Sequence, residues 1–181
     1  MSKDIVLVPL DSRPVNSDMP KLICMAAGVE CEIPDQDMLG KYMNPGNCDK
    51  IADWLLKKSA KNYVLSLDML LYGGLIASRG SISKPYSVQK GFLAISDLKK
   101  KNPDSKILCF STIRRLSTTV YSQESMIEWQ NMNTYLKAFY SKDFEKASAL
   151  KTKINPDIMK QYNLLRKRNL ENNLKAVELV S

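Results

Sequence analysis

Short apolar runs alternate with amphipathic segments along the first 111 residues, and this alternation predicts strands separated by helices. Polar residues hardly interrupt the apolar runs, as expected for strands that helices cover on both faces. Gly, Pro, Asp and Asn cluster between the runs and indicate turns. The predicted strands are residues 5–10, 30–33, 63–67 and 107–111, and the predicted helices between them are residues 17–27, 49–60 and 87–101.

This order of elements predicts an α/β fold with a mainly parallel sheet and crossover helices, either Rossmann-like or resembling part of a TIM barrel. A helical carboxy-terminal segment follows, with predicted helices at residues 122–140, 142–152 and 156–180. We therefore assign residues 1–120 to a parallel α/β domain and residues 121–181 to a helical segment packed on it. Four strands leave at least one sheet edge to be covered, so we expect a truncated part of a longer protein, with the rest of that chain as a partner.

Polar side chains gather where the predicted strands end. Parallel strands place their carboxyl ends at one edge of the sheet, where ligands of such folds bind. Asp11 and Asp68 follow the first and third strands and are the candidate catalytic residues. Asp35 and Asp37 follow the second strand. The candidate substrate-binding residues follow the first, third and fourth strands: Arg13, Tyr72, Gly73, Arg79 and Arg114.

Structural roles can also account for these residues. Asp11 can pair with Arg13, or it can cap the helix that follows. Asp68 comes directly after an apolar strand, so its charge must be paired or hydrated. The Gly73-Gly74 pair is typical of a tight turn, and it belongs to neither a dinucleotide-binding pattern nor a P-loop.

Composition excludes several chemistries. The chain contains no histidine, which excludes Ser-His-Asp and Cys-His nucleophile systems, and histidine-ligated metal sites, built from this chain alone. The cysteines lack the C-x-x-C spacing of zinc-ribbon and thioredoxin-like proteins, so we expect reduced thiols. They are Cys24, Cys31, Cys48 and Cys109. An Asp-rich edge offers oxygen ligands to Mg²⁺ or Ca²⁺, but no spacing demands a metal and the sequence specifies no cofactor.

The net charge of +8 is scattered over predicted helix ends and outer faces, without an arginine-rich arm or a nucleic-acid-binding motif. This distribution disfavours nucleic acid as a partner. No apolar run approaches the roughly 20 residues that span a bilayer. The apolar residues 5–10 are also too few for a secretory signal. We therefore expect a cytoplasmic chain without a membrane partner.

Residues 8–16 (VPLDSRPVN) and 66–79 (SLDMLLYGGLIASR) resemble motifs of DUF4127, a bacterial family of unknown function. Residues 113–117 and 166–173 extend the resemblance over nearly the whole chain. Family members commonly carry Asp where this chain has Ser12, which argues against a catalytic role there. The resemblance implies a further strand beyond this chain that ends in an Asp pair, so that the chain holds part of a site. It implies no established reaction, and it supports an edge site at Asp11, Arg13, Asp68, Tyr72, Arg79 and Arg114.

Three functions stay open. The first is an enzyme of glycosidase type, or part of one, that acts on a carbohydrate-like or anionic substrate. Asp11 and Asp68 would then serve as acid and base, roughly 5–10 Å apart. The alternative is a non-catalytic module that binds an anionic metabolite, such as a sugar phosphate or nucleotide, through Arg13, Arg79 and Arg114. Nucleic-acid binding is the third, and the scattered lysines make it the least favoured.

Overall fold

The computed structural model describes residues 3–41, 44–80, 85–115 and 122–180. The chain divides into two compact units. The first consists of Met1–Thr112 together with Asn173–Ser181, and the second consists of Ile113–Asn172. The packing of a helical segment on the α/β domain, expected from the sequence, stays a prediction.

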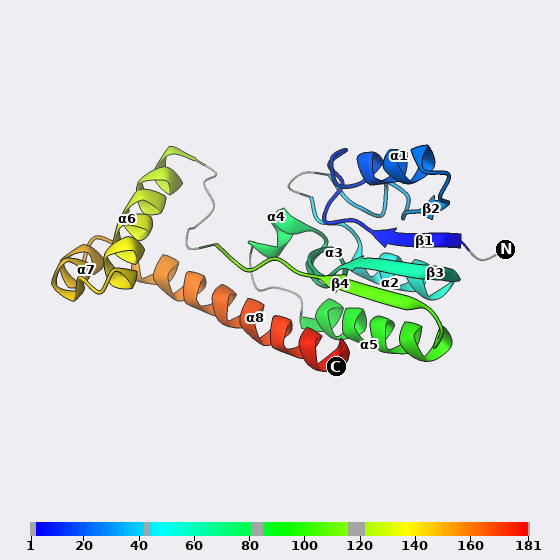
Figure 1. Cartoon of the computed structure of the whole chain (residues 1–181). Helices are drawn as coiled ribbons and strands as arrows, with labels where there is room; N and C mark the ends of the chain where they lie inside the picture. The colour runs from blue at the N-terminus through cyan, green and yellow to red at the C-terminus, as the bar shows by residue number, and fades with distance from the viewer. Residues whose placement is uncertain (1–2, 42–43, 81–84, 116–121, 181) are drawn as a thin grey trace. The chain divides into compact units, whose positions relative to one another are not determined.

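A four-stranded sheet forms the centre of the first unit (Figure 1). Its strands are β1 (Lys3–Val8), β2 (Cys31–Glu32), β3 (Ala60–Ser66) and β4 (Lys106–Phe110). They lie in the order β2-β1-β3-β4, and every neighbouring pair is parallel. The predicted α/β fold with a parallel sheet is therefore confirmed. Because β1 lies between β2 and β3, the sheet is the open, Rossmann-like kind; strands of a barrel follow one another in chain order.

This strand order places a reversal of chain direction in the middle of the sheet. The chain passes from β1 outward to β2 and then crosses back over β1 to β3. Ligands of open parallel sheets bind outside the carboxyl ends of the strands at such a point of reversal. The carboxyl ends of β1 and β3 therefore mark where a site is expected.

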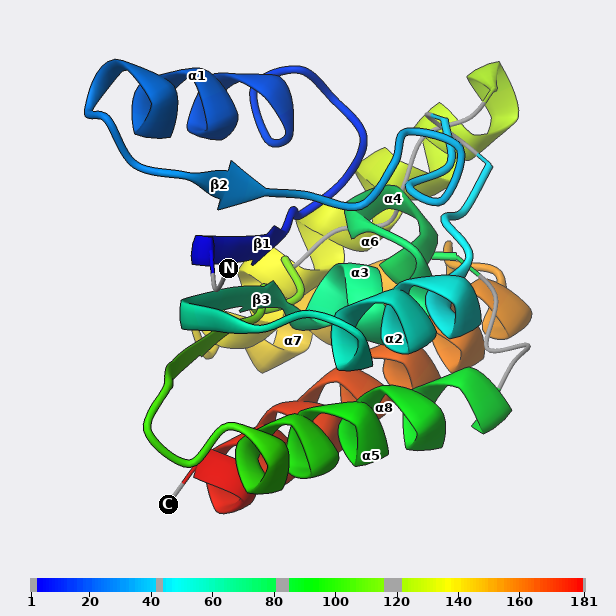
Figure 2. The same cartoon turned by 90° about the vertical axis from the view of Figure 1, so that its right-hand side faces the viewer.

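The main hydrophobic core lies between the sheet and three helices, α2 (Cys48–Leu56), α3 (Leu67–Tyr72) and α5 (Pro85–Lys101), which pack against one another. Figure 2 shows α2 and α5 together below the strands, with α1 (Asp18–Ala26) beside β2 at the top. Alternate strand residues enter this core, which explains their apolar character. Its fully buried members include Val6, Val8, Tyr63, Leu65, Leu70 and Leu98.

Side-chain caps decide where two of these helices begin. The side chain of Asn47 accepts a hydrogen bond of 3.0 Å from the backbone N–H of Lys50 and starts α2. Ser66, the last residue of β3, accepts one of 3.3 Å from the backbone N–H of Met69. Caps of this kind satisfy backbone donors that the first turn leaves unpaired. As a result β3 ends at Ser66 and a helix follows without a loop, whereas the sequence predicts a strand through Leu67.

The second unit is helical, as predicted. It contains α6 (Gln123–Tyr140), α7 (Phe144–Lys151) and the first part of α8 (Pro156–Val180). Ser122 and Ser125 form a capping box at the start of α6, and Asp143 caps α7. A separate small core holds these helices together, made by Met132, Leu136, Ile154 and Tyr162.

The last turns of α8 belong to the first unit. The hydroxyl of Ser111 donates a hydrogen bond of 2.7 Å to the side chain of Asn173, directly after β4. The ammonium of Lys175 lies 4.8 Å from the ring centroid of Phe92 on α5, a cation–π contact. Ala176 and Leu179 pack against the main core. Within the described residues, no helix combines the length and apolar character that crossing a bilayer requires.

Candidate functional site

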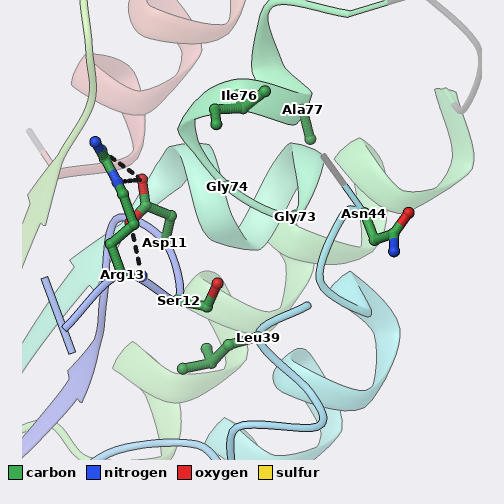
Figure 3. Close-up of a pocket in the computed structure, with 9 residues that line it drawn as sticks. All are labelled: Asp11, Ser12, Arg13, Leu39, Asn44, Gly73, Gly74, Ile76 and Ala77. Carbon is green, nitrogen blue, oxygen red and sulfur yellow. Dashed lines mark hydrogen bonds and ion pairs between the residues drawn. The ribbon is translucent and has the colours of Figure 1, made fainter. Parts of the chain in front are cut away.

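Asp11 lies in the turn after β1, and residues that follow it in the chain bind its carboxylate (Figure 3). The guanidinium of Arg13 donates from Nε to both carboxylate oxygens at 3.0 Å, and from Nη2 to Oδ2 at 2.7 Å. The backbone N–H of Arg13 and the side-chain amide of Asn16 donate to Oδ1 at 3.1 and 2.7 Å. Ser17, not Asp11, is the N-cap residue of α1. Of the two structural roles considered from the sequence, the ion pair is the one that forms.

These contacts change how Asp11 titrates. Burial alone raises its pKa, since only 8% of the residue is exposed. The hydrogen bonds from the Arg13 side chain, Asn16 and the Arg13 backbone, together with the charge of Arg13, outweigh burial and lower the pKa below its ordinary value of 3.8. The hydrogen bonds to Asp11 raise the pKa of Arg13 in turn. Asp11 and Arg13 are therefore both charged at neutral pH.

This shift predicts how stability depends on pH. A carboxyl whose pKa is lower in the folded chain stabilises the fold above its ordinary pKa, and the contribution disappears as the pH falls through the folded pKa. We expect Asp11→Asn to reduce stability at pH 6, and the difference from the wild type to shrink below about pH 4. Urea unfolding midpoints of both proteins from about pH 6 to pH 3 measure this. An equal difference at every pH would contradict the assignment.

Two glycines bring the segment after α3 against the turn after β1. Gly73 ends α3 with a φ of 82°, and Gly74 follows with a φ of 121°. A Cβ on Gly74 would lie 3.4 Å from the Cβ of Asp11, so the segment after α3 and the turn after β1 nearly touch here. The backbone N–H of Gly46 donates to the carbonyl of Gly73 at 2.9 Å, which ties the loop before α2 to the same place. We call the residues Asp11, Arg13, Gly73 and Gly74 the rim.

A small pocket lies at the rim (Figure 3). The Arg13 guanidinium lies over the Asp11 carboxylate, and the backbone of Gly73 and Gly74 forms one wall. Residues from the turn after β1, the loop before α2, and the segment after α3 that includes α4 (Leu75–Ser78) line it. They are Asp11, Ser12, Arg13, Leu39, Asn44, Gly73, Gly74, Ile76 and Ala77.

Asp68 occupies different surroundings. It lies in the first turn of α3, and only 1% of it is exposed. Its Oδ2 accepts from the backbone N–H of Thr112 at 2.9 Å, and its Oδ1 accepts from the Thr112 hydroxyl at 2.8 Å. Both carboxylate oxygens thus bind the residue that follows β4 closely in the chain. Asp68 is not among the residues that line the rim pocket.

The other predicted site residues divide between pocket and surroundings. Gly73 lines the pocket, as predicted. Tyr72 packs against the main core, and neither Tyr72 nor Arg79 lines the pocket. Arg114 belongs to the second unit, where its backbone N–H donates to the Asn169 side chain and its backbone carbonyl accepts from the Arg166 guanidinium. Its proximity to the rim stays a prediction.

Two partners of the site acids were not expected from the sequence. Asn16 is within the motif at residues 8–16, yet nothing in the sequence shows that its amide turns back to Asp11. Thr112 follows β4, and only the pairing of β3 with β4 brings it to Asp68. Asp35 and Asp37 are exposed and do not line the pocket. In the described part of the chain, no three His, Cys, Asp or Glu side chains gather closely enough to hold a metal ion.

Comparison with known proteins identifies the family but no activity. Neither a curated protein nor a solved structure matches this chain. The model of the family described as "Protein of unknown function (DUF4127)" matches residues 5–181, which is nearly the entire chain and includes every residue of the rim. The chain therefore belongs to the DUF4127 family.

Proposed function

We propose that the rim binds a small anionic metabolite, and that Arg13 is the residue that contacts it. The observation that carries this proposal is the fixed Asp11–Arg13 pair at the edge of a pocket at the reversal point of the sheet. Arg presents donors in a planar fork that matches carboxylate and phosphate groups.

Arg13 keeps donors for a ligand after it has bound Asp11. The bonds to Asp11 use Nε and Nη2 of the guanidinium. Nη1 makes no hydrogen bond to any other residue in the ranges the structure describes, and 47% of the side chain is exposed. Asp11 fixes the direction of the guanidinium, so a ligand does not have to order a flexible side chain. Asp11 is in this proposal a positioning residue.

Catalysis by Asp11 and Asp68 on a carbohydrate stays a prediction, and two contacts favour binding over it. A glycosidase needs one carboxyl that donates a proton and another that is free to attack or to act as a base. Asp68 uses both oxygens for Thr112, and Asp11 is paired with Arg13, which lowers its basicity. Neither carboxylate is therefore free in this arrangement.

Removal of Arg13 tests the proposal. We expect the full chain to bind a sugar phosphate such as glucose 6-phosphate more tightly than glucose, with an affinity that falls as salt is added. Arg13→Ala should weaken binding of the phosphate about tenfold, because it removes hydrogen bonds between charged groups. Titration calorimetry with the two sugars and with inorganic phosphate measures the effect.

Lys61 offers a matched control. Its Nζ lies 2.7 Å from Oδ1 of Asp4, a residue of β1, in an exposed ion pair at the amino end of the sheet. Lys61→Ala removes the same charge and a similar ion pair away from the rim, so it should leave phosphate affinity unchanged. Equal loss of phosphate affinity in the two variants would mean that net charge, and not the position of Arg13, causes the effect. Equal affinity for glucose and for glucose 6-phosphate would contradict an anion site.

A further inference from the structure

Two cysteines lie on either side of the connection between α1 and β2. Cys24 is in the last turns of α1, and Cys31 is the first residue of β2. The connection is tight, since the backbone N–H of Val29 donates to the carbonyl of Cys24 at 2.9 Å and Gly28 has a φ of 69°. Both thiols are free and partly buried.

Cys24 is on the face of α1 that points to the sheet. Ser17, Pro20 and Cys24 are spaced three and four residues apart, which places them on one side of a helix. Ser17 is fully buried and the other two are partly buried. The α1 residues between and beside them are exposed, among them Met19, Leu22, Ile23 and Met25.

Cys31 points back at this face of α1. The next residue, Glu32, pairs with Lys58 just after α2, on the opposite side of the sheet. Successive strand residues point to opposite faces, so Cys31 faces away from α2. Cys24 lies close enough to the Cys31 thiol to act on its charge, and Lys21, one helical turn before Cys24, also acts on this thiol.

We propose that Cys24 and Cys31 form a dithiol–disulfide pair that is oxidised by exchange with a small-molecule disulfide. One protein thiolate attacks a sulfur of the small disulfide, whose S–S bond breaks and releases one thiol. The second protein thiolate then attacks the protein sulfur of the mixed disulfide and releases the other thiol. The two cysteines lose two electrons and two protons, and the small disulfide is reduced to two thiols.

The surroundings of Cys31 set the order of these steps. Burial and the neighbouring Cys24 raise the pKa of the Cys31 thiol to about 12. Cys31 is therefore protonated at neutral pH, so Cys24 makes the first attack, and Cys31 releases its proton to solvent only when it attacks in the second step. A thiol with a high pKa is also a poor leaving group, so the disulfide should resist reduction once formed.

Oxidation of the folded full chain with oxidised glutathione tests the proposal. After quenching with an alkylating reagent in denaturant, we expect two free thiols in place of four. Peptide mass spectrometry should show Cys24 linked to Cys31, with Cys48 and Cys109 alkylated. The short loop that the bond closes should also raise the unfolding temperature by about 5 °C.

Single variants separate the two steps of the exchange. Cys31→Ser should retain a glutathione adduct on Cys24, because no second thiol is present to release it. Cys109→Ser is the matched control, since Cys109 is a partly buried thiol whose burial raises its pKa to about 11, and it should leave the Cys24–Cys31 bond unaffected. Four free thiols after oxidation of the wild type, or a bond between any other pair, would overturn the proposal.

Discussion

Gly73→Ala is expected to lower the free energy of unfolding by about 3 kcal/mol. Gly73 has a φ of 82°, a conformation that costs a residue with a Cβ roughly 1–2 kcal/mol. The added Cβ would also lie 2.5 Å from the carbonyl oxygen and 2.7 Å from the nitrogen of Gly46. Both are backbone atoms, and the Gly46 N–H is itself bonded to the Gly73 carbonyl, so neither segment can move without breaking that bond.

Gly28→Ala is the matched control for this substitution. Gly28 has a similar φ of 69°, but a Cβ there would meet no atom within 4 Å. Gly28→Ala should therefore lower the free energy of unfolding only through the unfavourable backbone conformation, by about 1 kcal/mol. Urea denaturation of both variants measures the two free energies. Equal losses would show that the contact with Gly46 is not tight, and that the glycine is needed only for its backbone conformation.

Strands were the part of the fold that the sequence predicts best. Residues 63–67 and 107–111 are apolar runs, which is the signal that predicts β3 and β4. Ile107 and Cys109 pack against the main core, but Leu108 and Phe110 on the other face of β4 are exposed, so the expected cover on both faces is absent there. The short β2 is predicted longer than it is, because its length depends on pairing with Ile5 and Val6 alone. The apolar pattern does not predict the helix at Leu67–Tyr72, because six mostly apolar residues directly after a strand look like a continuation of that strand.

The candidate site was predicted as a set of residues but not as a set of contacts. Parallel topology is enough to bring Asp11 and Asp68 to the same edge of the sheet. The partners of each carboxylate depend on side-chain rotamers and on strand register. No local sequence pattern specifies either of these. Asp11 therefore pairs with its neighbour Arg13, a contact two residues away, whereas Asp68 depends on Thr112, which is 44 residues away.

Because their partners differ, we expect the two carboxylates to have different roles. Asp11 orients a cation that solvent can reach, so a change there should affect ligands more than folding. Asp68 is shielded from solvent and joins the start of α3 to the chain after β4. Two carboxylates at the same sheet edge thus differ: Asp11 has the positioning role that we propose for ligand binding, and Asp68 holds parts of the fold together.

Asp68→Ala is therefore expected to cost about 3 kcal/mol of folding free energy. The change removes the carboxylate that accepts from the backbone N–H and the hydroxyl of Thr112, at a partly buried place. Hydrogen bonds to a charged group contribute about 1.5–3 kcal/mol each, and the desolvation of the carboxylate, which the variant avoids, offsets part of the loss. Urea or thermal unfolding of the variant measures the result.

Thr112→Val separates this structural role from a catalytic one. It removes the hydroxyl donor and keeps the backbone N–H and the shape, so it should cost about 1 kcal/mol alone and almost nothing in the Asp68→Ala background. Such non-additivity would show that the two residues stabilise the fold through each other. Asp68→Asn completes the comparison, because its amide keeps one acceptor and has no carboxyl. A stable Asp68→Asn protein that binds the phosphate probe normally but loses a hydrolytic activity of the wild type would overturn the structural assignment and restore Asp68 as a catalytic residue.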